Sequence, residues 1–208
     1  AYREEAGVSE RIEPGTTRFG LAIDVEKRGR RSLLVPNVKD AASLSFGGFL
    51  KGYNDIVKRA RDGSLQLDDF AGTTATLTNP GGGGTQLSIP RLMPGQSVIV
   101  AVGSIGFPPE YAGMDPSEVS RLGLSPVMTM TSTYDHRVIQ GAESGEFLNH
   151  IAALLQGEHG FYDGVFQSLG LHTPPFRIGS DSTPSLGKSA LGSGGRASKV
   201  EKQARVYE

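Results

Sequence analysis

Five short stretches rich in apolar or β-branched residues predict β-strands, and the last of them alternates apolar and hydroxyl residues as a half-buried strand does. The stretches cover residues 19–25, 32–38, 73–78, 96–102 and 127–134. Apolar residues spaced three and four positions apart predict two long helices, over residues 46–60 and 143–156. Ser45 is a suitable N-cap for the first, and Gly63 and Gly157 follow the two helices, where glycine favours termination. Because strands and helices are interspersed, the expected fold class is α/β or α+β.

The C-terminal end differs from the rest in composition. Between residues 179 and 200, 11 of 22 residues are Gly or Ser and none is aromatic, which predicts a flexible linker. We therefore expect a folded domain over residues 1–178, a linker over 179–200, and the start of a further helix or domain over 201–208. Two long helices are few for five strands, so we also expect part of the domain to precede residue 1.

The composition excludes several classes of protein. The 21 basic and 22 acidic residues nearly cancel, whereas a nucleic-acid-binding domain requires a basic surplus. The absence of cysteine excludes disulfides and a cysteine nucleophile, and it suits a reducing cytoplasm. No apolar run approaches the roughly 18 residues of a membrane span. The expectation is a soluble cytoplasmic protein without membrane or nucleic-acid partners, and the four histidines lack the spacing of metal ligands.

Three glycine-containing segments resemble phosphate loops but lack essential features. Residues 187–189 read Gly-Lys-Ser, yet Ser182 stands where the required earlier glycine would be. Residues 103–106 have no third glycine and no predicted helix after them. Residues 80–84 lack a lysine, and their four glycines predict a mobile loop whose backbone could approach a ligand closely.

One segment brings together side chains capable of chemistry. Asp135, His136 and Arg137 lie where a predicted strand ends and a turn leads into the second helix. A rigid strand end between opposite charges can hold an imidazole in one tautomer, as catalysis requires. A lone histidine in such a place is more often structural, so the residues alone leave both interpretations open.

The residues around His136 resemble the signature S-Y-D-H-R-x-x-D-G-A/R-E of dihydrolipoamide acyltransferases, the acyl-transfer components of 2-oxo acid dehydrogenase complexes. Residues 132–143 read STYDHRVIQGAE. Further segments match the family's motifs in the same order, namely residues 20–24, 34–39, 60–65, 68–70 and 76–79. The chain is identified as similar to this family from about residue 19 to 157.

Gln140 departs from the family, which usually carries Asp in this position. Followed by Gly-Ala-Glu-Ser-Gly, it is similar to a fused actinobacterial branch, the 2-oxoglutarate dehydrogenase/decarboxylases. In that branch a succinyltransferase domain precedes a thiamine-diphosphate domain on one chain. The long connection at residues 107–126 agrees with it. The resemblance implies a dihydrolipoamide S-succinyltransferase acting in the 2-oxoglutarate dehydrogenase reaction of the tricarboxylic acid cycle.

The resemblance also implies a fold and a mechanism. The fold would be the chloramphenicol-acetyltransferase-like two-layer α/β sandwich, a homotrimer with active sites between subunits. His136 would be the general base that deprotonates the coenzyme A thiol, and Thr78 would donate a hydrogen bond to the oxyanion. The residues expected to support this site are Asp135, Arg137, Gln140 and Asn79.

Substrates and partners follow from the same resemblance. Coenzyme A would accept the acyl group, and a lipoyl group on a partner protein would deliver it. Thiamine diphosphate and Mg would belong to a decarboxylase domain fused after this chain. Two alternatives remain: a catalytically idle trimeric scaffold, which Gln140 allows, and a small-molecule acetyltransferase of the same fold.

Overall fold

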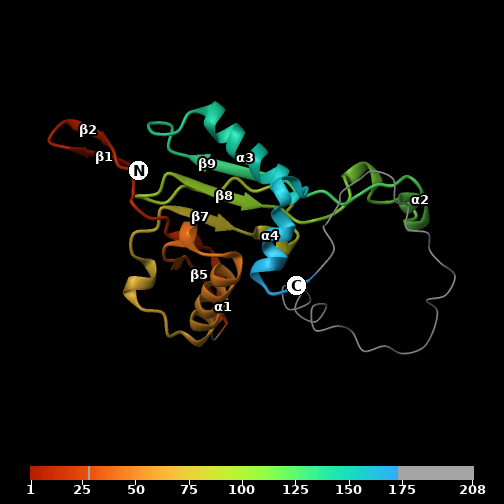
Figure 1. Cartoon of the computed structure of the whole chain (residues 1–208), viewed down its shortest axis with the longest axis horizontal. Helices are drawn as coiled ribbons and strands as arrows, with labels where there is room; N and C mark the ends of the chain where they lie inside the picture. Colours follow the sequence, from red (N-terminus) through yellow and green to blue (C-terminus); the bar gives the residue numbers. More distant parts are fainter. Residues whose placement is uncertain (28, 173–208) are drawn as a thin grey trace. The chain divides into compact units, whose positions relative to one another are not determined.

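A five-stranded mixed sheet forms the centre of the computed structural model, which describes residues 1–27 and 29–172 (Figure 1). In spatial order its strands are β6 (Asn37–Val38), β3 (Phe19–Leu21), β7 (Ala75–Thr78), β8 (Val98–Val102) and β9 (Met130–Tyr134). Strands β3, β7 and β8 are parallel, and the two edge strands run antiparallel to their neighbours. The predicted mixture of strands and helices is confirmed. The predicted linker and the segment 201–208 lie outside the described residues, so these boundaries stay predictions.

Two antiparallel hairpins accompany the central sheet. The first two predicted strands are each divided, because β4 (Ile23–Lys27) and β5 (Arg30–Leu34) pair only with one another. The other hairpin, β1 (Tyr2–Glu5) and β2 (Val8–Arg11), lies where no strand was predicted. Its turn residues Ala6 and Gly7 both have positive φ, 51° and 78°. Such turns usually carry Asn-Gly, so alanine in the first position gives no hairpin signal.

Four α-helices are present among the described residues: α1 (Phe46–Asp62), α2 (Pro116–Arg121), α3 (Gly141–Leu155) and α4 (Phe161–Ser168). Helices α1 and α3 confirm the two predicted helices. The Ser45 side chain accepts a hydrogen bond from the Gly48 N–H, and Gly63 ends α1 with φ of 72°. Helices α2 and α4 have six and eight residues, too few for a clear periodic pattern.

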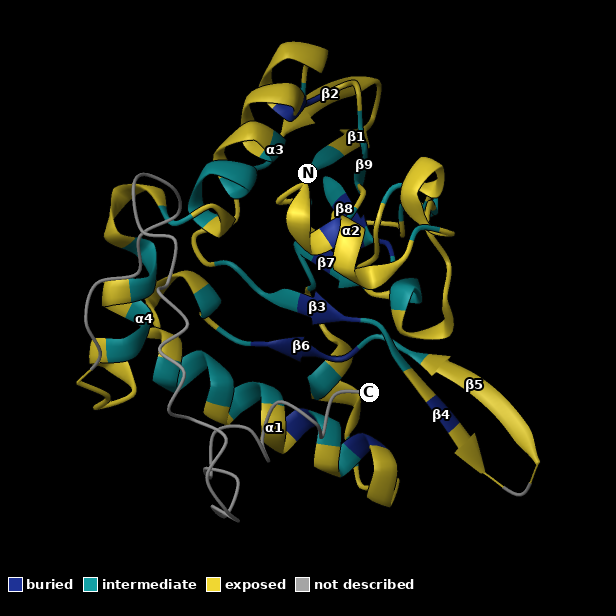
Figure 2. Cartoon of the chain, turned by 90° about the vertical axis from the view of Figure 1, so that its right-hand side faces the viewer, coloured by how far each residue is buried: buried dark blue, intermediate teal, exposed yellow. Residues whose placement is uncertain are grey.

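Helices α1 and α3 cover the same face of the sheet at its two sides. The strand register places one row of side chains on this face: Leu21, Leu77, Val100 and Ser132. Ile56 of α1 packs on Leu21, and the Ser144 hydroxyl of α3 lies 2.7 Å from that of Ser132. Figure 2 shows buried residues along β3 and β6 next to α1. The core therefore lies between the sheet and this helical layer.

The opposite face of the sheet is held by hydroxyl groups. Thr131 and Thr133 of β9 donate to backbone carbonyls of residues 88 and 90, which ties the segment before β8 across β9. Beside them, the buried Thr76 hydroxyl donates to the Gln96 side chain at 2.6 Å. Three consecutive hydroxyl residues of β9, Thr131, Ser132 and Thr133, thus make hydrogen bonds on both faces of the sheet.

The glycine-rich segment 80–84, predicted from the sequence to be a loop, contains a short helical turn. Pro80–Gly83 forms a short 3-10 helix that packs on the backbone after β8. A Cβ atom at Gly81 would lie 2.3 Å from the Gly103 carbonyl oxygen, and one at Gly103 would lie 2.0 Å from the carbonyl oxygen of Gln86. Gly81 and Gly103 are required because backbone meets backbone here, within the chain itself.

This close packing predicts that Gly103→Ala lowers the free energy of unfolding by about 3 kcal/mol, because the added methyl meets a backbone oxygen that cannot move freely. Gly82→Ala is the matched control, since a Cβ at Gly82 meets no atom within 4 Å. Urea denaturation of both variants measures the difference. Equal stabilities would show that the contact around Gly103 is loose.

Candidate active site

His136 lies in the turn that joins β9 to α3, as the sequence predicted. The Asp135 N–H donates to the Ser97 carbonyl at 2.9 Å, which fixes the turn to the start of β8. The N–H groups of Val138 and Ile139 both donate to the Asp135 carbonyl at 3.0 Å. Val138 is buried, whereas His136 is exposed. The turn is therefore anchored on both sides of a histidine that faces solvent.

The flanking charges of the turn form an ion pair. Arg137 Nε and Nη2 donate to the two carboxylate oxygens of Asp135 at 2.8 and 2.7 Å, and the Arg137 N–H adds a third bond. These bonds hold the pKa of Asp135 below its usual range. The Asp135 side chain is only 11% exposed, so its charge is fixed in place. His136 thus sits at the apex of a turn closed by a bidentate pair.

Two tyrosines that were not among the predicted site residues, Tyr134 and Tyr2, pack against this turn. The Tyr134 ring lies beside the His136 ring with centroids 5.5 Å apart. The Arg137 guanidinium lies 3.8 Å from the centre of the Tyr2 ring, a cation–π contact. Tyr134 could have been found from its place two residues before His136. Tyr2 could not, because β1 gave no sequence signal.

Thr78 ends β7 at the opposite end of the sheet from His136. The register pairs Thr78 with Ala101 and Ala101 with Thr131, whereas Tyr134 pairs with Val98. Three residues along the strands and two strand spacings separate Thr78 from Tyr134, about 14 Å between backbones. Neither side chain spans that distance, so one chain does not bring its own two candidate groups together.

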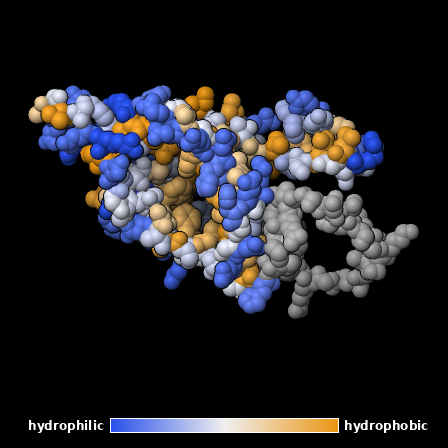
Figure 3. Space-filling model, turned by 45° about the horizontal axis from the view of Figure 1, so that its top comes forward, coloured by the Kyte–Doolittle hydropathy of each residue, from blue (hydrophilic) through white to orange (hydrophobic). Residues whose placement is uncertain are grey.

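The surroundings of Thr78 are open. Asn79 is exposed and precedes the 3-10 helix of the glycine-rich segment. Among the described residues, no hydrogen bond uses the Thr78 hydroxyl, which leaves its O–H free to donate. After β8, Ile105 is 74% exposed, and Val127, whose backbone bridges that of Gly106, is 52% exposed. Figure 3 shows that hydrophobic side chains, in orange, are exposed at several places among hydrophilic residues.

A pocket of about 660 Å³ opens at the His136 end of the sheet. Its wall includes Thr74 and Ser97, and the Ser97 carbonyl is the one bound by the His136 turn. The remaining wall is largely apolar, with Leu33, Phe70 and Met93 contributing side chains. Apolar walls with a few polar groups are typical of pockets for small molecules.

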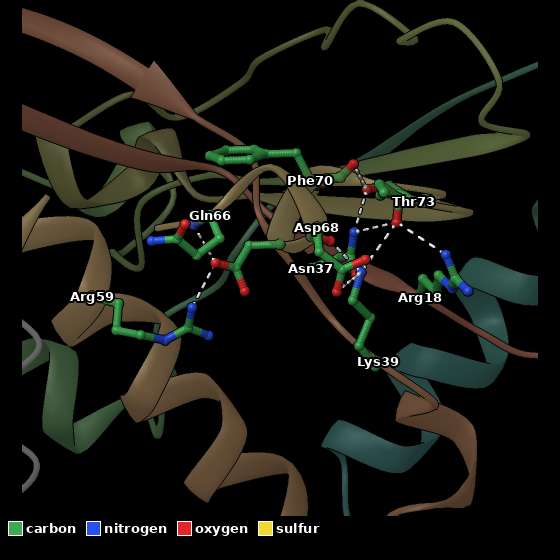
Figure 4. A network of polar contacts seen from close by, with 10 residues as sticks. Arg18, Asn37, Lys39, Arg59, Gln66, Asp68, Phe70 and Thr73 are labelled. Atoms are coloured by element: carbon green, nitrogen blue, oxygen red, sulfur yellow. Dashed lines mark hydrogen bonds and ion pairs between the residues drawn. The ribbon is translucent and has the colours of Figure 1, made fainter. Parts of the chain in front are cut away.

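A polar network fixes the segment that leads into β7 (Figure 4). Arg59 Nη1 donates to Asp69 Oδ2 at 2.5 Å, a bond that also lowers the pKa of Asp69. The buried Asn37 amide donates to the Ala71 carbonyl at 3.1 Å and to the Thr73 hydroxyl at 2.9 Å. The Asp-Asp-Phe segment is thereby held in one conformation, which positions both the pocket wall at Phe70 and the start of β7.

Gln140 is the N-cap residue of α3 and is exposed. Its backbone N–H donates to the Glu143 carboxylate at 2.6 Å, so the acidic residue of the first turn closes the helix start. The Gln140 side chain in turn accepts from the backbone N–H of Glu143, which completes a capping box. The helix start therefore tolerates glutamine where the family usually carries aspartate.

Two further histidines, His150 and His159, lie near each other. The rings of His150 and His159 lie 5.9 Å apart, but no group of three metal-ligating residues occurs within residues 1–27 and 29–172. None of the helices in that same part of the chain is long and apolar enough to cross a bilayer.

Comparisons with known proteins agree with the motif resemblance. The family model for the catalytic domain of 2-oxoacid dehydrogenase acyltransferases matches residues 3–160. The chain is 47% identical over 186 residues to a multifunctional 2-oxoglutarate metabolism enzyme of Mycolicibacterium vanbaalenii, an alignment that covers 89% of this chain. The matched part of this chain corresponds to 15% of the length of that relative.

Solved structures show the same fold at low identity. A truncated catalytic core of the 2-oxoacid dehydrogenase complex from Thermoplasma acidophilum has a TM-score of 0.59 at 24% identity, covering 76% of this chain and 65% of the other. The dihydrolipoamide acetyltransferase of Azotobacter vinelandii has a TM-score of 0.56 at 22% identity, covering 76% and 61%. The motif order, the mixed sheet and the family match together establish that the chain belongs to the 2-oxoacid dehydrogenase acyltransferases.

Proposed function

We propose that this chain transfers a succinyl group from succinyl-dihydrolipoamide to coenzyme A. The proposal is carried by the exposed His136, held in a turn anchored to the sheet and closed by an ion pair. The succinyl preference is supported by the identity to enzymes named for 2-oxoglutarate metabolism, because decarboxylation of 2-oxoglutarate leaves a four-carbon acyl group. Coenzyme A and a lipoyl group are substrates of this reaction, and no metal takes part in it.

In the proposed mechanism, an imidazole nitrogen of His136 removes the proton from the coenzyme A thiol. A thiol with a pKa of about 8.5 is only a few per cent ionised at pH 7, so a positioned base raises the rate by about 10² to 10⁴. The thiolate sulfur attacks the thioester carbonyl carbon, and Thr78 donates its O–H to the resulting oxyanion. The bond to the lipoyl sulfur then breaks, and the imidazolium returns its proton to that sulfur.

The Azotobacter acetyltransferase provides a parallel for these residue types. Its structure was studied for the roles of a serine, a histidine and an asparagine in its catalytic mechanism, the asparagine four residues after the histidine. Here Gln140 follows His136 by the same four residues, and Thr78 supplies the hydroxyl. A carboxamide after the histidine is therefore compatible with acyl transfer, which favours an active enzyme over an idle scaffold.

We place the complete site between two subunits of a homotrimer. The strand register separates Thr78 from His136 within one chain, so a neighbour must supply one of them. Large exposed apolar side chains near the Thr78 end, such as Ile105, suit contact with another subunit. The acyl group would arrive on the lipoyl arm of a partner. A thiamine-diphosphate decarboxylase, fused to this chain or separate, would supply it.

The central prediction is that His136→Ala lowers the rate of succinyl-coenzyme A formation at least 100-fold, because the reaction loses its base. His136 is exposed, so folding should be unaffected. His172→Ala, another exposed histidine, is the matched control. Wild type should prefer succinyl- to acetyl-dihydrolipoamide. More than a tenth of wild-type rate in His136→Ala removes the residue from the mechanism, and a wild type inactive with every thioester supports the scaffold.

A shared site predicts that two inactive variants restore activity when they assemble together. In trimers formed at random from equal amounts of His136→Ala and Thr78→Ala chains, about a quarter of the interfaces pair an intact histidine with an intact threonine. Transfer activity should therefore recover to about that fraction of wild type. Confirmed mixed trimers without activity would place both residues in the same chain's site.

The Asp135–Arg137 pair predicts an acid-sensitive turn. Because the folded-state pKa of Asp135 is lowered, its contribution to stability is present above the ordinary value of about 3.9 and disappears as pH falls through the depressed pKa. The difference in unfolding free energy between wild type and Asp135→Asn should shrink as pH falls below about 4. Urea titrations at several pH values measure it, and a pH-independent difference contradicts the role of the ionised pair.

A further inference from the structure

We infer that Tyr134 is a positioning residue that sets the orientation of the His136 imidazole. The inference rests on the proposed function of His136 as the general base. It concerns a side chain that touches the base without touching the reacting atoms.

The contact between the two rings is direct. Their centroids lie 5.5 Å apart and their planes are inclined by 52°. This separation is within the 4.5–7 Å range in which aromatic pairs attract one another. Among the described residues, no hydrogen bond holds either nitrogen of His136, and the side chain is exposed. The ring of Tyr134 is therefore the group that restricts the imidazole before substrate binds.

Tyr134 is itself fixed by the scaffold. Its backbone pairs with Val98, and its half-buried ring lines a pocket of about 220 Å³ together with Val98, Val138 and Phe147. A Cβ atom built on Gly141, at the start of α3, would lie 3.5 Å from the Tyr134 hydroxyl oxygen. The ring is thus enclosed by β8, the His136 turn and the first turns of α3. Because the Tyr134 ring is held in place by the sheet, its contact with the otherwise unrestrained His136 ring can set the orientation of the base.

Orientation matters here because a general base acts only within hydrogen-bonding reach of the proton that it removes. The ion pair of Asp135 and Arg137 fixes the backbone of the turn, but it does not restrict the side-chain torsions of His136. A misplacement of about 1 Å costs about 100-fold in rate. Backbone anchoring and ring contact therefore have separate effects, and separate variants can test them.

Two substitutions isolate the ring contact. Tyr134→Phe keeps the aromatic face and removes only the hydroxyl, whereas Tyr134→Leu removes the ring and keeps an apolar side chain. Phe147→Leu is the matched control, because Phe147 lines the same pocket, whereas the ring contact recorded for His136 within residues 1–27 and 29–172 is that of Tyr134. A loss common to Tyr134→Leu and Phe147→Leu would reflect repacking of the pocket.

The readout combines nuclear magnetic resonance with kinetics on the full chain. The chain has four histidines, so labelling of histidine Cε1 gives four signals, and His136→Gln identifies one of them. The Tyr134 ring current should displace the Hε1 signal of His136. Tyr134→Leu should move this signal towards the position of a free histidine and lower kcat about 10- to 100-fold with little change in KM. In Tyr134→Phe, the Hε1 signal of His136 and kcat should both stay near their wild-type values.

Each other outcome overturns the inference. An unchanged His136 signal in Tyr134→Leu means that the rings are not in contact. A displaced signal with unchanged kcat means that the contact does not position the base, and an equal loss in Phe147→Leu assigns the effect to packing. A wild type without transfer activity overturns the proposed function and with it the positioning role, while the signal separately reports whether the ring contact exists.

Discussion

The register of β7, β8 and β9 determines where every candidate group of this protein lies. Strands β7 and β8 run parallel and β9 returns antiparallel, so the carboxyl ends of β7 and β9 lie at opposite ends of the sheet. Thr78 is the last residue of β7, and His136 lies two residues after the last residue of β9. A shift of one residue in either pairing would turn the side chains to the other face. The hydroxyl bonds of Thr131 and Thr133 to the segment that crosses β9 oppose such a shift.

Both candidate groups lie at ends of the sheet, and many polar interactions hold the connections there. The His136 turn is tied to β8 through Ser97 and closed by the Asp135–Arg137 pair. The segment before β7 is tied down by the Arg59–Asp69 bond and by the buried Asn37. Both groups of interactions are local and polar. On the proposed mechanism, they hold two half-sites rigid so that subunit assembly can complete them.

Several features could be predicted from sequence because short-range rules determine them. Helix α1 has its period, its Ser45 cap and its Gly63 terminus encoded within twenty residues. The turn at Asp135 and Arg137 was likewise expected, since two opposite charges two residues apart can pair locally. The β1–β2 hairpin, with alanine at positive φ, had no such local signal. The close packing of the glycine-rich segment was not predicted, because Gly103, the packing partner of Gly81, lies 22 residues further along the chain.

The sequence by itself therefore determined the family, the main helices and the identity of the candidate base. The resemblance implied a site between subunits, but the tertiary structure fixed the separation of Thr78 and His136 within one chain. It alone decided that Tyr134 and Tyr2 pack against the turn. The physical reason is that strand order and register follow from the joint packing of distant segments on both faces of the sheet. A motif fixes which groups are available, whereas only the packed sheet fixes the distances between them.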